Sequence, residues 1–249
     1  MNQIILEAKG ICKSFEGSEV LRDISFQVEK GEFVAVMGQS GCGKSTLLYS
    51  LSGMDSPTGG EVVFEGQKFT DLSEKEMEKL RLTRMGFIFQ RANFLKNLSI
   101  EDNIIFPAFQ AGEKSRQKIV KEAEELMERM GIMSVADHDI RKVSGGQLQR
   151  AAICRAMINH PAILFGDEPT GALNSSATKE VMDILEKIHQ TGTTILLVTH
   201  DAKVAARAER VIYLEDGRIR DEYRPGSLED AKEGKREKTL DDWLAKMGF

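Results

Sequence analysis

Several features that would narrow the class of protein are scarce or missing in this sequence. The chain has only three cysteines, Cys12, Cys42 and Cys154, without CxxC spacing, so we expect reduced thiols rather than a disulfide scaffold. It has no basic excess, because 34 Lys and Arg stand against 39 Asp and Glu, and a net charge of −5 argues against nucleic-acid binding and against adsorption to an anionic membrane. No apolar run approaches the roughly 18–20 residues of a membrane span, and the first residues lack a signal-peptide pattern. We therefore expect a globular cytoplasmic protein.

Short β-prone runs alternate with helical patterns along most of the chain. With 249 residues, 41% of them hydrophobic, the chain can form one large α/β unit or two domains. Short alternating strands are expected at 4–8 and 25–28, and buried strands at 33–37, 163–165 and 195–198, with a helix at 178–189. The order strand–helix–strand predicts parallel pairing. Residues 113–130 place apolar side chains on one helical stripe, which predicts a helical subdomain at about 91–160.

Residues 38–45 read Gly-Gln-Ser-Gly-Cys-Gly-Lys-Ser and fit the GxxxxGK[ST] pattern between an expected strand and an expected helix. Glycines allow successive backbone N–H groups to point at phosphate oxygens, and the helix adds the positive end of its dipole. Lys44 would bridge the outer phosphates, and the Ser45 hydroxyl would ligate Mg²⁺. The alternative is a glycine-rich turn with a chance lysine. The pattern predicts a nucleotide-binding loop formed by Gly38, Gln39, Ser40, Gly41, Cys42, Gly43, Lys44, Ser45 and Thr46.

Cys42 lies inside this loop, close to a helix N-terminus, where a thiolate is favoured. Two interpretations stay open at this point. The side chain is either a small residue that the loop tolerates or a redox-sensitive group.

An acidic pair follows the apolar run 162–166. Ligands of α/β proteins bind at the carboxyl ends of strands, so Asp167 is placed to hold Mg²⁺. Glu168 is then placed to polarise a water molecule for in-line attack on a γ-phosphate. The alternative is that the two carboxylates only cap the turn at Pro169.

A third motif decides the class of protein. Residues 143–147 read Val-Ser-Gly-Gly-Gln and precede an expected helix, which forms a second anion-binding helix start. The three motifs in this order resemble those of the nucleotide-binding subunits of ABC transporters, over residues from about 4 to 219. The resemblance implies a P-loop NTPase of the α/β class, with a RecA-like core, an antiparallel β subdomain and a helical subdomain. It also implies ATP and Mg²⁺ as cofactors and ATP hydrolysis as the activity.

The resemblance assigns further roles residue by residue. Phe15 matches the aromatic that stacks on adenine, where tyrosine is commoner, and Gln90 matches the glutamine that touches Mg²⁺ and links the site to the membrane partner. His200 matches the histidine that contacts the γ-phosphate. A core role for Phe15 and a structural role for His200 are the alternatives. The signature residues, which contact the γ-phosphate of the opposite subunit, are Ser144, Gly145, Gly146 and Gln147. The resemblance thus implies Glu168, His200 and Lys44 as catalytic residues and Ser45, Gln90 and Asp167 as metal ligands.

Two positions depart from the family pattern. Val143 stands where leucine is usual, and both side chains are apolar. Asn174 ends the loop 171–174, which crosses the dimer interface in the family, where aspartate is usual. Asparagine keeps an acceptor oxygen but loses the charge, so coupling between subunits can differ there.

The partners implied are a second copy of the chain, in a head-to-tail dimer that sandwiches ATP, and a transmembrane permease, with no nucleic acid. The chain would sit on the cytoplasmic face of the membrane, held by the permease. The segments 85–104 and 168–175 resemble the branch of lipoprotein-release, macrolide-export and cell-division ATPases, and most closely its antimicrobial-peptide (bacitracin-type) resistance members. Phe94 and Leu95 are expected to line the permease groove, with the core of the helical subdomain as the alternative place. A soluble ABC ATPase acting on nucleic acid or ribosomes and a small-molecule kinase are the alternative functions.

We expect an ABC ATPase domain at 1–224 and a charged extension at 225–249. Residues 239–247 predict a short amphipathic helix with Thr239 as its N-cap. Its apolar stripe contains Leu240, Trp243, Leu244 and Met247. The stripe would pack on its own domain or the dimer mate, or else dock on the permease.

Overall fold

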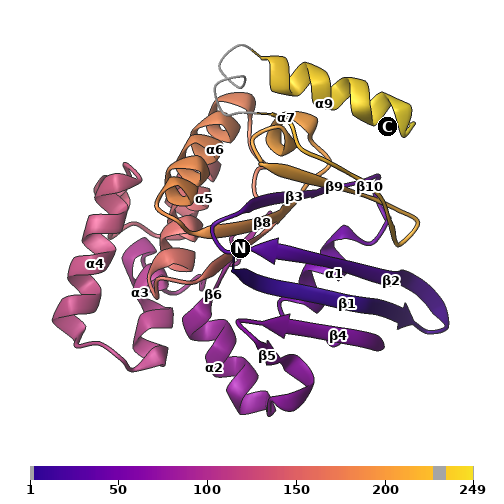
Figure 1. Ribbon diagram of the computed structural model, residues 1–249. Helices are drawn as coiled ribbons and strands as arrows, with labels where there is room; N and C mark the ends of the chain where they lie inside the picture. The colour runs from indigo at the N-terminus through magenta and orange to yellow at the C-terminus, as the bar shows by residue number, and fades with distance from the viewer. Residues whose placement is uncertain (1–2, 227–233, 249) are drawn as a thin grey trace. The chain divides into compact units, whose positions relative to one another are not determined.

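The computed structural model describes residues 3–226 and 234–248, and it divides into two compact units (Figure 1). The first unit contains Met1–Met77 and His189–Phe249, and the second contains Glu78–Ile188. Among the described residues, no helix has both the length and the apolar character needed to cross a bilayer.

The first unit contains the predicted antiparallel sheet, with strand order β2-β1-β4-β5. Its strands are β1 (Ile4–Phe15), β2 (Ser18–Glu29), β4 (Gly59–Phe64) and β5 (Gln67–Lys68). Strands β1 and β2 are each 12 residues long, so the expected short strands at 4–8 and 25–28 were wrong in length. The pairing shifts register between Ala8 and Ile11 and again beyond it, which breaks the alternation on which the expectation relied.

Four further strands of the first unit lie side by side in the order β10-β9-β3-β8. They are β3 (Phe33–Met37), β8 (Thr194–Val198), β9 (Arg210–Glu215) and β10 (Arg218–Tyr223). Strand β3 runs parallel to both β8 and β9, as is typical of α/β proteins, although the parallel pairing was predicted for the strands at 163–165 and 195–198. Every residue of β3 and β8 is buried, as a continuous apolar run predicts for parallel strands. Besides α9, described below, the helical elements that lie wholly in this unit among the described residues are η1 (Phe69–Asp71), α1 (Lys44–Leu51) and α7 (Ala202–Ala205).

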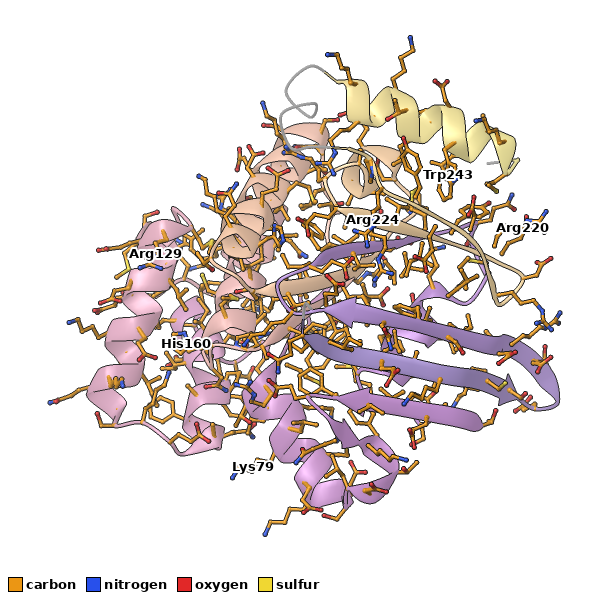
Figure 2. The ribbon with its side chains drawn as sticks, in the orientation of Figure 1. Lys79, Arg129, His160, Arg220, Arg224 and Trp243 are labelled. Atoms are coloured by element: carbon orange, nitrogen blue, oxygen red, sulfur yellow. The ribbon has the colours of Figure 1, made fainter. Side chains whose placement is uncertain are left out.

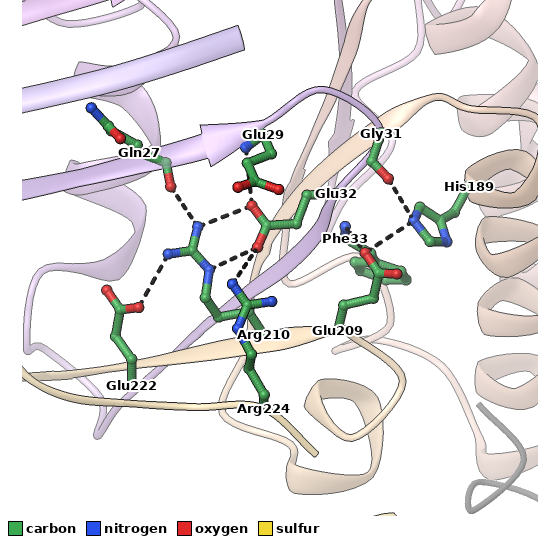
Figure 3. A network of polar contacts seen from close by, with 10 residues as sticks. All are labelled: Gln27, Glu29, Gly31, Glu32, Phe33, His189, Glu209, Arg210, Glu222 and Arg224. Atoms are coloured by element: carbon green, nitrogen blue, oxygen red, sulfur yellow. Dashed lines mark hydrogen bonds and ion pairs between the residues drawn. The ribbon is translucent and has the colours of Figure 1, made fainter. Parts of the chain in front are cut away.

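A buried polar network joins the β2–β3 corner to β9 and β10 (Figure 3). Arg210 Nε lies 2.9 Å from Glu32 Oε1, and its Nη1 lies 3.1 Å from a Glu222 oxygen. Glu32 and Arg210 are only 5% and 8% exposed. Because burial of an unpaired charge is costly, the ion pair is what allows both side chains to stay charged. Beside this pair, His189 Nε2 lies 2.8 Å from Gly31 O. The network therefore fixes the base of the strand layer that carries the loop after β3.

Helix α9 (Lys235–Lys246) packs on its own unit. Trp243 is labelled in Figure 2. It stacks on Tyr223 with ring centroids 5.3 Å apart and donates from Nε1 to Asp221 Oδ2 over 3.1 Å. Leu240 is fully buried, so the predicted apolar stripe docks internally. The predicted N-cap was wrong, because Gly234 caps the helix and the Thr239 hydroxyl donates to the Arg236 carbonyl inside it.

The second unit contains two parallel strands and most of the helices. Strands β6 (Met85–Phe89) and β7 (Ile163–Asp167) pair in parallel. The predicted helical subdomain is formed by α3 (Ile100–Ala111), α4 (Arg116–Arg129), η2 (Met133–Val135), η3 (Ile140–Lys142) and α5 (Gly145–Met157). The two boundaries between the units fall within helices α2 (Glu74–Arg84) and α6 (Ser175–Gln190), so most residues of both helices belong to the second unit. The domain bounds expected at 224 and 225 stay a prediction.

Candidate functional site

The loop between β3 and α1 has its lysine folded back into the loop. Lys44 opens α1 and is 6% exposed, and its Nζ donates to the carbonyl oxygens of Gly38 and Gln39 at 2.8 Å each. Gly43 is the N-cap, with φ of 104°, and contributes no side-chain hydrogen bond to the first turn of α1. The ammonium group is therefore held at the centre of the loop next to a helix N-terminus, as an anion-binding site requires.

Only glycine fits at Gly38. A Cβ on this residue would lie 2.2 Å from Leu214 O and 2.6 Å from Cys42 Sγ. The loop therefore passes against the backbone of β9 with no space for a side chain. This close packing supports the prediction of a phosphate cradle over that of a chance glycine-rich turn.

Cys42 is a half-buried thiol within the loop. Burial raises its pKa, although the nearby Lys44 ammonium acts in the opposite direction. The sequence argument for a favoured thiolate was therefore wrong, because burial outweighs the helix start and the lysine. The interpretation as a small residue tolerated by a tight loop is the better one.

His200 follows the strand next to β3. Thr199 N donates to Val36 O over 3.0 Å, so the chain after β8 leaves the sheet at the same edge as the Lys44 loop. His200 is exposed at this edge, and Thr199 is buried beneath it. The two predicted phosphate-contacting residues of the first unit therefore follow neighbouring parallel strands.

Phe15 ends β1 and is 47% exposed, so the alternative of a core aromatic does not hold. The Nζ of Lys13 lies 4.8 Å from the centre of its ring. Lys13 is itself buried, and its Nζ lies 2.6 Å from Asp55 Oδ1 and donates to Ser56 O over 2.6 Å. A cation fixed against one face of the ring leaves an aromatic platform whose position is set by β1. The sequence reasoning missed Lys13.

A cavity of about 600 Å³ opens beside the Lys44 loop. Gln39 and Cys42 line it from the loop, Val20 from the start of β2, and Glu215 and Asp216 from the turn after β9. Only the loop residues were predicted from the sequence, because nothing in the motif points to the turn between β9 and β10.

In the second unit, the acidic pair and Gln90 follow neighbouring strands. Asp167 pairs with Phe89 across β7 and β6, so Glu168 and Gln90 are the next residues of adjacent strands. A Cβ on Gly171 would lie 2.7 Å from Gln90 Nε2 and 3.2 Å from Glu168 Oε2, so both side chains converge on this glycine. Glu168 has φ of 45°, a left-handed conformation that is strained for a bulky residue and common at functional sites. The turn after β7 therefore not only ends the strand but also places the Glu168 side chain beside that of Gln90.

The signature residues form a complete capping box at the start of α5. Ser144 Oγ accepts from Gln147 N at 3.3 Å, and Gln147 Oε1 accepts from Ser144 N at 2.9 Å. Ser144 and Gly145 are exposed. The helix start is therefore preformed and faces outward, which the sequence reasoning did not foresee, although Ser-x-x-Gln is the pattern of a capping box.

A cavity of about 470 Å³ joins the signature to the loop 171–174. Arg150 of α5 forms an ion pair with Glu180 of α6 across it. Asn174 Oδ1 accepts from Ala177 N at 2.9 Å and so caps α6. Asparagine is therefore compatible with this position, since the cap needs an acceptor oxygen but not a charge.

The predicted residues thus fall into two groups. Lys44, Ser45, His200 and Phe15 belong to the first unit, and the acidic pair, Gln90 and the signature belong to the second. Within each group the structure brings neighbouring motifs together. The predicted metal ligands are a hydroxyl, a carboxylate and an amide, an all-oxygen set that suits Mg²⁺. Among the described residues, no cluster of three His, Cys, Asp or Glu is placed to hold a metal, so a His- or Cys-based metal centre is not supported there.

The family model described as ABC transporter matches residues 21–171 of the chain. The chain belongs to the ABC transporter family of ATPases. The chain is also 42% identical over 215 residues to the lipoprotein-releasing system ATP-binding protein LolD of Aquifex aeolicus, with 86% of this chain and 96% of LolD covered. The predicted ABC ATPase class and its branch are thereby confirmed.

Other relatives of this ABC ATPase agree. It is 42% identical over 232 residues to the macrolide export ATP-binding/permease protein MacB of Campylobacter jejuni, with 93% of this chain covered. The chain spans about a third of the length of the MacB relatives, 35% in this case. Among solved structures, a dimeric post-hydrolysis state of the ATP-binding cassette MJ0796 with ADP and Pi is similar, with a TM-score of 0.83, 35% identity and coverage of 90% and 100% of the two chains. The predicted fold is therefore confirmed as that of an ABC cassette.

Proposed function

We propose that two copies of this ABC ATPase form a head-to-tail dimer that hydrolyses ATP and drives a membrane permease. One observation supports this most directly. The chain has one phosphate loop, in which Lys44 is buried, and a second, exposed anion-binding helix start at Ser144. An exposed end suits a nucleotide held by another copy. MJ0796, at 35% identity, is described as a dimer.

In the proposed reaction, each motif has one task. Lys44 holds the outer phosphate oxygens, while Ser45, Asp167 and Gln90 present oxygen atoms for Mg²⁺. Glu168 orients and polarises the attacking water, and His200 contacts the γ-phosphate. Phe15 stacks on the adenine. ATP and Mg²⁺ supply the transferable phosphoryl group and the positive charge that offsets its oxygens.

The permease is the proposed membrane partner, at the cytoplasmic face. Among the exposed large apolar side chains of the second unit are Leu95 at 49%, Phe106 at 41% and Phe109 at 42%. Leu95 lies on the loop after Gln90, and the two phenylalanines lie on α3. An apolar surface next to a metal-binding glutamine suits a permease helix. Phe94, also predicted for the groove, is half-buried.

Antimicrobial-peptide resistance is the transport function that we propose, on the resemblance of the segment 168–175. A second candidate is macrolide export or lipoprotein release, because relatives of both kinds are 42% identical to this chain. Deletion of the gene, followed by bacitracin and macrolide susceptibility tests, separates these candidates. Sensitivity to bacitracin alone supports peptide resistance, sensitivity to macrolides alone supports macrolide export, and sensitivity to neither contradicts both and leaves lipoprotein release.

The test of the chemistry is Glu168→Gln. This variant should bind ATP as the wild type does, hydrolyse it about a thousandfold more slowly, and accumulate as a nucleotide-bound dimer. Light scattering with ATP should show the shift from monomer to dimer. Glu128→Gln on the exposed face of α4 is the matched control. Wild-type hydrolysis by Glu168→Gln would rule out the assignment.

A further inference from the structure

We propose that Arg155 is a positioning residue for the reaction, which locks the loop after Gln90 onto the signature helix α5. This inference rests on the proposed function, because it assigns Gln90 and Ser144 to one catalytic cycle. All the residues that carry it belong to the second unit.

Arg155 holds three consecutive residues of the loop. Its Nη2 donates to Ala92 O at 2.5 Å, and its Nη1 donates to Asn93 O at 3.2 Å. The guanidinium carbon also lies 4.6 Å from the centre of the Phe94 ring. A planar fork is the side chain that can bind two successive carbonyls and stack on an aromatic face at once. Arg155 therefore fixes the loop in position and in orientation.

The loop is held at two further points. Gln149, one and a half turns earlier on α5, is 3% exposed and donates from Nε2 to Phe89 O at 3.0 Å, just before Gln90. Asn103 on α3 is 2% exposed, and its side chain accepts from Leu95 N at 2.7 Å and donates to Leu95 O at 3.1 Å. Gln90 thus lies between backbone positions that side chains of α5 hold on both sides.

Burial makes the Arg155 cation dependent on its contacts with residues 92–94, which are together called the clamp. Burial lowers the pKa of Arg155 to about 10, so the desolvated cation depends on its carbonyl and aromatic partners. Asn93 has φ of 45°, a left-handed conformation that asparagine tolerates, and its carbonyl oxygen accepts from Arg155 there. Since α5 begins at the exposed Ser144 end, Arg155 makes the signature and the Gln90 loop move as one piece.

The test compares Arg155→Met with wild type in the full chain. Methionine keeps the apolar stem but removes both donors. We expect kcat to fall about tenfold with KM for ATP within about twofold, because Gln90 is displaced while the Lys44 loop is intact. Amide exchange of residues 92–95 should rise about tenfold, while exchange of 150–154 in α5 stays as in wild type. Arg155→Lys should recover less than about a third of kcat, because an ammonium lacks the two-donor fork.

Arg129→Met is the control, an exposed arginine at the end of α4 (Figure 2), and it should change none of these values. A purely structural arginine would give a different result in Arg155→Met, with a lower melting temperature and faster exchange throughout α5. That result, or a wild-type kcat, would overturn the proposal. If Glu168→Gln hydrolyses ATP normally, the proposed function fails instead, and faster exchange confined to 92–95 would still support the clamp.

Discussion

Helices α1 and α5 both begin at a predicted phosphate-binding motif, but their first turns are built differently. Helix α1 starts after Gly43, which has a left-handed conformation and offers no side-chain acceptor. Helix α5 starts after Ser144, which forms a reciprocal capping box with Gln147. At the start of α1, the Lys44 side chain is bound by loop carbonyl oxygens and no side chain caps the helix. At the start of α5, side chains of the helix itself supply the cap.

Burial separates the two ends in the same way. Lys44 is 6% exposed, whereas Ser144 and Gly145 lie at the surface. The Lys44 side chain is enclosed by its own loop, whereas the self-capped Ser144 end is open to a ligand from outside the chain. Two similar motifs thus differ in the way that the proposed function requires, in which the Lys44 loop binds the nucleotide of its own chain and the Ser144 end contacts that of a second copy.

The largest difference should appear in nucleotide binding by the monomer. Lys44→Ala removes the ammonium at the centre of the loop and should weaken ATP binding at least about a hundredfold. Ser144→Arg should leave ATP binding by dilute monomer within about twofold but abolish the ATP-dependent dimer, because the added bulk and charge occupy the helix start. Titration with a fluorescent ATP analogue at low protein concentration measures both. Equal loss of binding in the two variants would contradict the comparison.

Adding a methyl group should separate the two ends next. In Gly38→Ala the new Cβ would lie 2.2 Å from Leu214 O, and this overpacking should lower the free energy of unfolding by about 1–3 kcal/mol. In Gly145→Ala the nearest atom is Leu173 Cδ2 at 3.7 Å, an ordinary contact. This variant should unfold like wild type. Urea denaturation of both variants checks the contrast, and a stable Gly38→Ala would break it.

Removal of the cap should affect α5 alone. Ser144→Ala should lower the free energy of unfolding by about 1 kcal/mol, because Gln147 N loses its acceptor, the Ser144 hydroxyl oxygen. Helix α1 has no such side-chain bond, so Gly43 offers no equivalent loss. The matched control is Ser134→Ala, an exposed serine in η2, which should have no measurable effect. An unchanged urea midpoint in Ser144→Ala would show that the box contributes nothing.

The Lys44 loop contains Cys42 and helix α5 contains Cys154, and the rates at which the two thiols are alkylated should differ slightly. Burial raises the pKa of the Cys42 thiol and raises that of Cys154, inside α5, to about 12. A raised pKa means less thiolate at pH 8, so iodoacetamide should modify Cys42 slowly and Cys154 hardly at all. Both rates should rise with pH, and ATP should slow only that of Cys42. Rapid modification of Cys42 at pH 7, measured by mass spectrometry, would contradict the effect of burial.

The sequence predicted the motif-bearing parts of this molecule well. The parallel strands, the Lys44 loop and the helix after Ser144 each follow from a local pattern whose physical meaning is known. Strands β1 and β2 were predicted too short, because bulges interrupt the alternation that marks a strand. The start of α9 was missed because Thr239, a good N-cap residue, lies inside the helix.

The contacts that hold the candidate site together could not be read from the sequence. Arg155 contacts the loop after Gln90 from 63 residues further along the chain, which no local pattern encodes. Lys13 is only two residues from Phe15, but its position depends on Asp55 and Ser56, 42 and 43 residues away. The left-handed backbone of Glu168 has the same origin, since tertiary packing imposes it on an ordinary residue. The cap formed by Asn174 is a local contact that the sequence could have predicted. It was not predicted, because the departure from aspartate was interpreted as a change of charge.

Mixing two inactive variants tests the central claim most directly, namely that the Lys44 loop of one copy works with the Ser144 end of another. Lys44→Ala and Ser144→Arg should each be inactive alone. If the ends act across the dimer, a mixed dimer contains one intact pair, and an equal mixture should recover about a quarter of wild-type ATP hydrolysis. If both ends of one chain serve the same nucleotide, every copy is damaged, and the mixture should show only the sum of the two residual rates.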